Sequence, residues 1–298
     1  MPNGILLLDK PRGLSSNAAL QRVRRLFQGA KAGHAGSLDP LATGMLPICI
    51  GEATKIAGDI VAGAKHYRFA IALGARTASG DAEGEVTERA AVPALTRAQV
   101  EGVLAAFVGA RSQVPPMYSA VKQGGQPLYR LARAGQTVER AARAIELYEV
   151  ALIALGAQSL VVETSCSKGT YVRVLAEEIA AALGTVGYVS ELRRLSVEPF
   201  GRESMHTLER LERSGGDAGA PLLPADYPLQ YLPAVSLTSD AAMRLRKGQA
   251  VAVAGVRAAR LAQGETERVR IYEESGLFLG VGIADAAGAV RPKRLLNP

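Results

Sequence analysis

The chain has 298 residues, of which 48% are hydrophobic, so its composition excludes a disordered protein and its length allows two folded domains. Its formal net charge is +7 and its isoelectric point is about 9.5, which favours an anionic partner, nucleic acid being the usual candidate. The two cysteines, Cys49 and Cys166, are too few for a disulfide framework and indicate a reducing cytoplasm. No signal peptide and no apolar run of the roughly 18 to 20 residues that a membrane span needs is visible.

The N-terminal segment predicts a buried strand, a turn and a basic helix. Gly4 to Leu8 is almost wholly apolar, and Ser16 or Asn17 is suited to cap a helix in which apolar residues recur at helical spacing. Six basic residues and no acidic one follow the strand: Lys10, Arg12, Arg22, Arg24, Arg25 and Lys31. Such a run is usually a solvated helix face, but the missing counter-charges favour a stripe that faces RNA.

Residues 33–44 have neither helical nor strand periodicity. Three glycines and one proline in this segment permit sharp turns and a close approach of the backbone to a ligand. The segment holds one carboxylate, Asp39, and one imidazole, His34, five residues earlier. On spacing alone a plain turn at Asp39-Pro40 with a solvated histidine fits as well as a functional loop does.

The middle of the chain predicts alternating strands and helices. Residues 66–73 alternate polar and apolar, as in a half-buried strand, and Thr96 with Gln99 forms a capping box before an apolar helix face. Residues 145–155 and 159–166 are predicted to pair as strands. Thr170 is then expected to cap a helix, which a final strand region follows.

The segment 123–143 is rich in Gly, Arg and Gln, with a helix-like piece at 128–133. We interpret it as a long insertion that grips a ligand, although a plain surface loop is also consistent with it. The basic side chains in and just before this segment suit contacts with phosphate: Lys122, Arg130, Arg133, Arg140 and Arg143.

Residues 221–233 contain several prolines and are predicted to be a linker. Beyond Leu232 short strand-like pieces alternate with glycine turns, and ten Lys/Arg outnumber six Asp/Glu. This pattern predicts a small basic β-barrel.

The chain carries no clear cofactor motif. Its three histidines and two cysteines are not at zinc-ligand spacing. Lys168-Gly169-Thr170 lacks the upstream glycines of a phosphate-binding loop, and no GxGxxG follows the first strand. We therefore expect neither a metal nor an organic cofactor.

A set of short motifs occurs in one order between Leu6 and Leu195. They are Leu7-Leu8-Asp9-Lys10-Pro11, the run Gly33 to Lys55, Lys65-His66-Tyr67-Arg68-Phe69, Asp81-Ala82-Glu83-Gly84, Pro115-Pro116-Met117-Tyr118-Ser119-Ala120, Cys166-Ser167-Lys168-Gly169-Thr170-Tyr171-Val172-Arg173 and Glu191-Leu192-Arg193-Arg194. In this combination the chain resembles the bacterial tRNA pseudouridine-55 synthases, the TruB family. It departs from that family at Ala35, where Thr is usual, and at Ala78, where Asp is usual.

The resemblance implies the α+β pseudouridine synthase fold, with a mixed, largely antiparallel sheet flanked by helices. The stretch 276–282 resembles the PUA module, a small β-barrel that binds RNA. We accordingly expect a catalytic domain at 1–230, with a thumb-like RNA-gripping insertion at 123–143, and a PUA-like RNA-binding domain at 231–298.

The resemblance also implies an activity: isomerisation of uridine 55 in the T-loop of tRNA to pseudouridine, without a cofactor. It assigns catalysis to Asp39, which acts either as a nucleophile on ribose C1′ or as a base on the C2′ proton. Arg173 is implied as the partner of this carboxylate, where residue pattern alone would also allow an exposed arginine.

The remaining assignments concern the flipped base. Tyr67 is implied to stack on the uracil, although its pattern also suits a core residue, and Tyr171 and Leu192 are implied to line the pocket. His34 resembles the residue that fills the space left by the flipped base. Asp81 is expected to support the pocket.

We expect the T-arm of tRNA as the partner, no membrane contact, no obligatory protein partner and a monomer in the cytoplasm. The first alternative is the related guide-dependent synthase of ribonucleoproteins, against which the 123–143 insertion argues. The second alternative is a module that only binds or refolds tRNA. A hydrolase that uses Asp39 is the least supported alternative.

Overall fold

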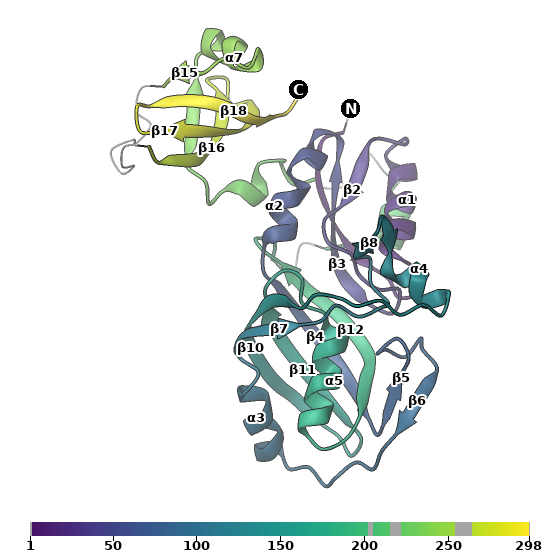
Figure 1. Ribbon diagram of the computed structural model, residues 1–298. Coiled ribbons are helices and arrows are strands. Elements are labelled where there is room, and N and C mark those ends of the chain that lie inside the picture. Colours follow the sequence, from purple (N-terminus) through teal and green to yellow (C-terminus); the bar gives the residue numbers. More distant parts are fainter. Residues whose placement is uncertain (1, 202–204, 215–221, 254–263, 298) are drawn as a thin grey trace.

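The computed structural model describes residues 2–201, 205–214, 222–253 and 264–297. Within these ranges the chain forms a nine-stranded mixed sheet flanked by helices and a separate, curled five-stranded sheet at the C-terminal end (Figure 1). This is the α+β architecture expected from the sequence. None of the helices in these ranges is both long and apolar enough to cross a membrane.

The large sheet has the strand order β13-β1-β3-β12-β4-β11-β10-β7, with β2 beside β3. Its strands, in chain order, are β1 (Gly4–Lys10), β2 (Ala32–His34), β3 (Thr43–Ile50), β4 (Lys65–Leu73), β7 (Gly109–Gln113), β10 (Arg143–Leu155), β11 (Ser159–Cys166), β12 (Gly187–Val197) and β13 (His206–Thr207). All neighbours are antiparallel except β1 with β13 and β3 with β12, so the sheet is mixed and largely antiparallel.

The small sheet has the order β14-β16-β17-β18-β15. Its strands are β14 (Ala234–Leu237), β15 (Val251–Ala252), β16 (Thr266–Glu273), β17 (Phe278–Asp285) and β18 (Ala289–Leu295). Two short hairpins complete the strands, formed by β5 (Ala75–Thr77) with β6 (Val86–Arg89) and by β8 (Lys122–Gln123) with β9 (Gln126–Pro127).

The helices are short and connect the strands. They are α1 (Ser16–Leu26), η1 (Gly51–Ile56), α2 (Ala57–Ala62), α3 (Arg97–Ala105), α4 (Leu128–Arg133), α5 (Val172–Ala182), α6 (Leu208–Arg213), η3 (Tyr227–Leu229) and α7 (Ser239–Arg246). Two expected caps are wrong by one residue: Ser15, not Ser16 or Asn17, caps α1, and Tyr171, not Thr170, occupies the N-cap position of α5. The Thr96–Gln99 capping box of α3 is confirmed.

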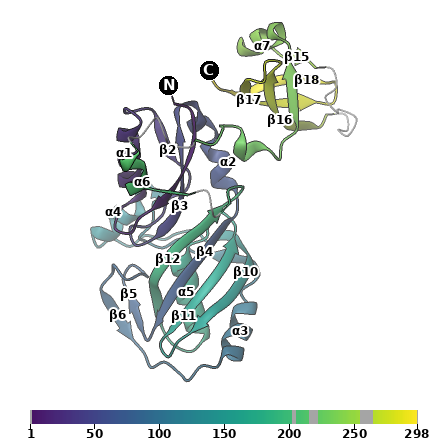
Figure 2. The ribbon, with the colours of Figure 1, turned by 180° about the vertical axis from the view of Figure 1, so that it is seen from behind.

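The apolar patterns of the strands follow from which faces are covered. In β1, Leu6 and Leu8 belong to the core under α1 and α6, whereas Ile5 and Leu7 belong to a second core on the opposite face, so the strand is apolar throughout. Strand β4 buries only the face that α5 covers, and its pattern alternates (Figure 2).

The second core joins the two sheets. Val281 and Leu296 of the C-terminal sheet pack with the apolar face of α2 and of η3. Leu229 and Leu232 are also buried there, so the described part of the expected linker, residues 222–233, is a packed connection between the two sheets. The apolar residues of this segment, which recur between its prolines, find their partners in the large sheet.

Candidate active site

The loop between β2 and β3 carries Asp39 and depends on glycine at two places. Gly36 and Gly44 have φ angles of +90° and +99°, which side chains on L residues rarely allow. A Cβ on Gly44 would also lie 2.1 Å from the backbone oxygen of Arg194, so this close approach of loop and β12 requires glycine.

Buried polar side chains hold this loop from below. Ser16 accepts a hydrogen bond from the Leu38 amide at 2.7 Å and donates one to the Leu38 carbonyl at 3.0 Å. Arg194, only 1% exposed, donates to the carbonyls of Gly36 and Met45 at 3.0 and 2.7 Å. The backbone on both sides of Asp39 is therefore fixed by side chains that are buried, where water cannot replace these hydrogen bonds.

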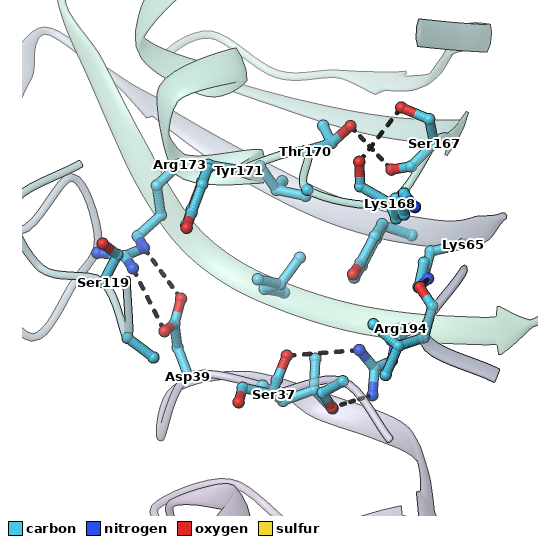
Figure 3. Close-up of a pocket in the computed structure, with 18 of the residues that line it drawn as sticks. Ser37, Asp39, Lys65, Ser119, Ser167, Lys168, Thr170, Tyr171, Arg173 and Arg194 are labelled. Carbon is cyan, nitrogen blue, oxygen red and sulfur yellow. Dashed lines mark hydrogen bonds and ion pairs between the residues drawn. The ribbon is translucent and has the colours of Figure 1, made fainter. Parts of the chain in front are cut away.

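Asp39 faces Arg173 at the beginning of α5. The Arg173 Nε lies 2.9 Å from Asp39 Oδ2, and its Nη2 donates to Oδ1 at 3.3 Å, so the pair is bidentate (Figure 3). Arg173 also donates to the carbonyls of Ser79 and Tyr118 at 2.8 and 2.6 Å. Its side chain is 6% exposed, whereas that of Asp39 is 38% exposed, so the carboxylate presents itself to an incoming ligand.

Two carboxylates share this one guanidinium. Asp81 Oδ2 lies 3.8 Å from the Nε of Arg173, and the Asp81 side chain is 5% exposed. Burial raises the pKa of Asp39 above its ordinary value, the charge of Arg173 opposes this rise, and the charge of Asp81 adds to it. The site therefore makes Asp39 a stronger base than an exposed aspartate.

A cavity of about 400 Å³ opens between the Asp39 loop and the segment that leads into α5 (Figure 3). Five of the residues singled out in the sequence line it: Asp39, Tyr67, Tyr171, Arg173 and Leu192. They come from the loop, from β4, from the start of α5 and from β12, which are distant in sequence. The cavity has one carboxylate at its edge, and its wall contains two tyrosine rings and several aliphatic side chains, Leu192 among them.

The wall residues are fixed by packing and by backbone contacts. Tyr67 is 9% exposed and Leu192 is 7% exposed, on neighbouring strands of the sheet. The side-chain amide of Gln113 accepts from the Tyr171 amide at 2.7 Å and donates to its carbonyl at 3.2 Å. Tyr67 is thus both a core residue and part of the cavity wall.

His34 and Asp81 do not line this cavity. They line a second cavity, of about 790 Å³, that also touches Asp39 and Arg173. The Nδ1 atom of His34 is buried and has no hydrogen-bond partner within the described ranges. Burial and the nearby charge of Arg194 lower the pKa of His34, which keeps the ring neutral at pH 7. Asp39 stands between the two cavities.

The 123–143 insertion borders the second cavity. It contains the β8–β9 hairpin and α4, whose bounds match the helix-like piece expected at 128–133. Tyr129 and Arg133 of α4 line the cavity wall. Of the expected phosphate contacts, Arg140 donates to the Pro115 carbonyl at 3.1 Å, whereas Lys122 and Arg130 are open to solvent or to a ligand.

Three cations are buried: Arg194 and Lys65 were given no role from the sequence, whereas Lys10 was expected in the stripe that faces RNA, and that expectation is wrong because its side chain is 0% exposed. Arg194 supports the loop, and Lys10 donates to the Leu14 and Pro40 carbonyls at 2.6 and 3.4 Å. Lys65 lies in the first cavity and donates to the Val61 carbonyl at 2.5 Å. Burial lowers the pKa of Lys10 and of Lys65 to about 8. Arg194 was detectable, because it stands two residues after Leu192 and so on the same, buried strand face.

Comparison with known proteins covers nearly the whole chain. Residues 24–172 match the TruB family pseudouridylate synthase (N terminal domain), 173–230 match the tRNA pseudouridylate synthase B C-terminal domain, and 233–296 match Pseudouridine synthase II TruB, C-terminal. A protein of Chromohalobacter salexigens named tRNA pseudouridine synthase B is 47% identical over 99% of this chain and 94% of its own. The protein of that name from Stutzerimonas stutzeri is 45% identical over 99% and 96%.

A solved structure with a similar fold is a Cbf5-Nop10-Gar1 complex. One of its chains aligns with a TM-score of 0.72 over 99% of this chain and 85% of its own, at 23% identity. A chain in an archaeal box H/ACA sRNP Nop10-Cbf5 complex aligns with a TM-score of 0.70 at 19% identity. These likenesses show a shared pseudouridine synthase fold.

Proposed function

The chain belongs to the TruB family of pseudouridylate synthases, and from that membership we propose that it isomerises uridine 55 in the T-loop of tRNA to pseudouridine. The enzyme is an isomerase. The observation that carries the proposal is the bidentate pair of Asp39 and Arg173 at the edge of a cavity that has Tyr67 in its wall. One oriented carboxylate and one flat hydrophobic wall are what the reaction needs.

The chemistry at Asp39 follows one of two balanced routes. As a nucleophile, its oxygen forms a bond to ribose C1′ while the bond from C1′ to uracil N1 breaks, and the turned base displaces the carboxylate through C5. As a base, it takes the C2′ proton while the same glycosidic bond breaks, and returns the proton after C5 has bonded to C1′. In both routes the C5 proton finally leaves and N1 gains one, so no oxidant or metal enters the balance.

Arg173 serves both routes by holding the carboxylate in one orientation and in its ionised form. A free carboxylate samples several rotamers, whereas two parallel contacts leave one. The two further backbone contacts of Arg173 fix the guanidinium itself.

We propose that the target base enters the first cavity after it has left the RNA stack. Tyr67 then stacks on the uracil, with Tyr171 and Leu192 completing the pocket. His34, in the second cavity, occupies the space that the base leaves, and its neutral ring suits contact with neighbouring bases. Asp81 helps to hold the Arg173 guanidinium through a second, longer ion pair.

We also propose a division of labour along the chain. Residues 1–230 carry out catalysis, the insertion 123–143 grips the T-arm beside the second cavity, and residues 231–298 bind RNA as a PUA-like domain. The protein is proposed to act as a monomer in the cytoplasm, without a guide RNA or a protein partner. The position of α4 against the second cavity supports direct gripping of tRNA.

The experiment is to incubate unmodified tRNA transcript with the pure protein and to map pseudouridine along it. We expect one new pseudouridine, at position 55, without any added factor. Product at another position would overturn the site specificity, and product only with a guide RNA would favour the guide-dependent alternative.

A further inference from the structure

Another cavity, of about 440 Å³, lies at the joint between the two sheets, outside the candidate active site. Its walls come from η1 and α2 on one side and from β16, β17 and β18 on the other. Four basic residues line it, against one acidic residue: Lys55, Arg268, Lys293, Arg294 and Asp59. Such an excess of positive charge in a concave site favours an anion.

The acidic residue does not neutralise this cavity. Asp59 is bound to Arg268 at 2.6 Å, and Lys55 is held by Glu52 at 2.6 Å and by the Leu295 carbonyl at 2.9 Å. Lys293 and Arg294 are exposed, and their side chains have no hydrogen bond or ion pair with any residue in the described ranges. The positive charges of Lys293 and Arg294 therefore face the cavity without an ion-pair partner in the described ranges.

The cavity is close to the proposed catalytic pocket. Val61 of α2 lines the pocket beside Asp39, and Asp59 of the same helix lines the basic cavity. Two residues correspond to about 200° around a helix, so the cavities lie on opposite sides of α2, roughly one helix diameter of 10 to 12 Å apart. An RNA strand with one base in the first cavity reaches the second by crossing α2.

An exposed aromatic side chain lies beside the basic cavity. Tyr231 is 68% exposed, and its hydroxyl accepts a hydrogen bond from Arg268 at 3.4 Å. A cation-lined groove with an accessible ring is typical of surfaces that bind the backbone and stack the bases of RNA. A small free anion would make no use of this ring.

We infer that this cavity binds a backbone phosphate of the RNA whose target base occupies the pocket at Asp39, through Lys293 and Arg294. The inference rests on the proposed function, because that function supplies the RNA that the cavity would bind. The site connects the catalytic part and the C-terminal sheet through one strand of substrate. It places RNA contacts on β18, at the joint, and not on the outer end of the C-terminal sheet.

The test uses the full-length chain with Lys293 and Arg294 both changed to alanine. Arg246 and Lys247 are the matched control, because they are two exposed cations at the end of α7, which lies away from α2 (Figure 1). Each protein also carries Asp39→Asn so that tRNA is bound without turnover. Affinity for unmodified tRNA is measured over a series of salt concentrations.

We expect the Lys293/Arg294 variant to bind tRNA at least about tenfold more weakly at low salt, and the slope of log affinity against log salt concentration to fall in magnitude by about 0.7 to 0.9, the value for one phosphate. The control pair is expected to stay within about twofold of the parent. Ethylation of single phosphates should identify one position that matters for the parent and not for the Lys293/Arg294 variant.

Equal binding by the Lys293/Arg294 variant and its parent would overturn the inference. So would a thermal shift by inorganic phosphate that the variant loses while its tRNA affinity is unchanged, since that assigns the cavity to a free anion. The wild-type protein is assayed on the same tRNA, and absence of pseudouridine there would sink the proposed function instead.

Discussion

At the scale of single residues, the site is governed by one guanidinium shared between two carboxylates. Arg173 lies 2.9 Å from Asp39 and 3.8 Å from Asp81, and the Arg173 and Asp81 side chains are buried whereas that of Asp39 is partly exposed. Burial raises the pKa of Asp39, and Arg173 limits that rise. The balance matters because Asp39 must be ionised in either proposed route.

This balance predicts the acid limb of the pH–rate profile. Because the ionised form is active, the rate is full above the raised pKa of Asp39 and is lost as pH falls through it. In Arg173→Gln the opposing charge is gone, so the acid limb moves to higher pH and the rate falls by about 10² or more. Single-turnover rates between pH 4 and 8 check this.

Arg173→Lys is the matched control for charge. It should keep the acid limb close to that of the wild type while it loses rate, because it keeps the charge and loses the bidentate contact. An acid limb that is the same in all three proteins would show that Asp39 does not control the reaction.

His34 is predicted to act on base extrusion and not on bond cleavage. Extrusion costs a few kcal/mol, which a side chain in the vacated space partly offsets. His34→Ala should slow the reaction on folded tRNA and affect a short unstructured RNA of the same local sequence much less. Single-turnover rates on both RNAs separate these effects, and an equal loss on both would end the plug hypothesis.

At the scale of elements, the catalytic loop is positioned by its neighbours more than by its own residues. Ser16 at the start of α1 makes two hydrogen bonds to Leu38, the residue before Asp39. Adjacent to it, Ser15 accepts from the Ala18 amide as the N-cap of the same helix. Ser16 therefore stabilises the loop that carries Asp39, whereas the adjacent Ser15 stabilises the start of α1.

Their substitutions should separate stability from catalysis. Ser16→Ala leaves the buried amide of Leu38 unpaired, and both Ser16→Ala and Ser15→Ala should cost about 1 kcal/mol or more in the free energy of unfolding. Only Ser16→Ala should also lower the single-turnover rate, by about tenfold. Urea unfolding together with product formation measures both, and equal rates for the two variants would show that Ser16 has no positioning role.

The sequence predicted elements well where periodicity was clear, and contacts poorly where they depended on the tertiary structure. The alternation in β4 and the capping box of α3 identified those elements, because both signals are local. The predicted cap of α1 was one residue too late. The Ser16 hydroxyl bonds to Leu38 of the Asp39 loop, and Ser15 accepts from the Ala18 amide as the N-cap.

In the site, motif resemblance named Asp39 and Arg173, and the structure brings them together. It did not reveal that His34 lies in a different cavity from Tyr67, because that depends on how β2 and β4 are placed in the sheet. The position of Arg194 on a buried strand face was detectable, but the partners of Lys10 and Arg194 were out of reach, since they are backbone carbonyls, which every residue has.

At the scale of the whole molecule, the two sheets are joined by a core and by polar contacts. Val281 and Leu296 pack against the large-sheet side, and the Asp59–Arg268 pair spans the same joint at 2.6 Å. The Asn297 amide also donates to Glu52 at 2.7 Å. The C-terminal sheet therefore stabilises the large sheet through these contacts, in addition to its proposed contact with RNA.

This joint predicts a single unfolding transition. Thermal unfolding of the full chain should show one calorimetric peak, and removal of the residues after Leu232 should lower the melting temperature of the remainder, because apolar surface on α2 and η3 becomes exposed. Two well-separated peaks in the full chain, or an unchanged melting temperature after truncation, would show that the parts are independent.

The most direct test of the central claim compares wild type with Asp39→Asn on unmodified tRNA, at saturating pure enzyme and in a single turnover. We predict pseudouridine at position 55 with the wild type and none with Asp39→Asn, while tRNA affinity stays within a few-fold. The asparagine keeps the shape of the side chain and removes the charge that both routes require. Pseudouridine formed by the pure Asp39→Asn protein would contradict the account.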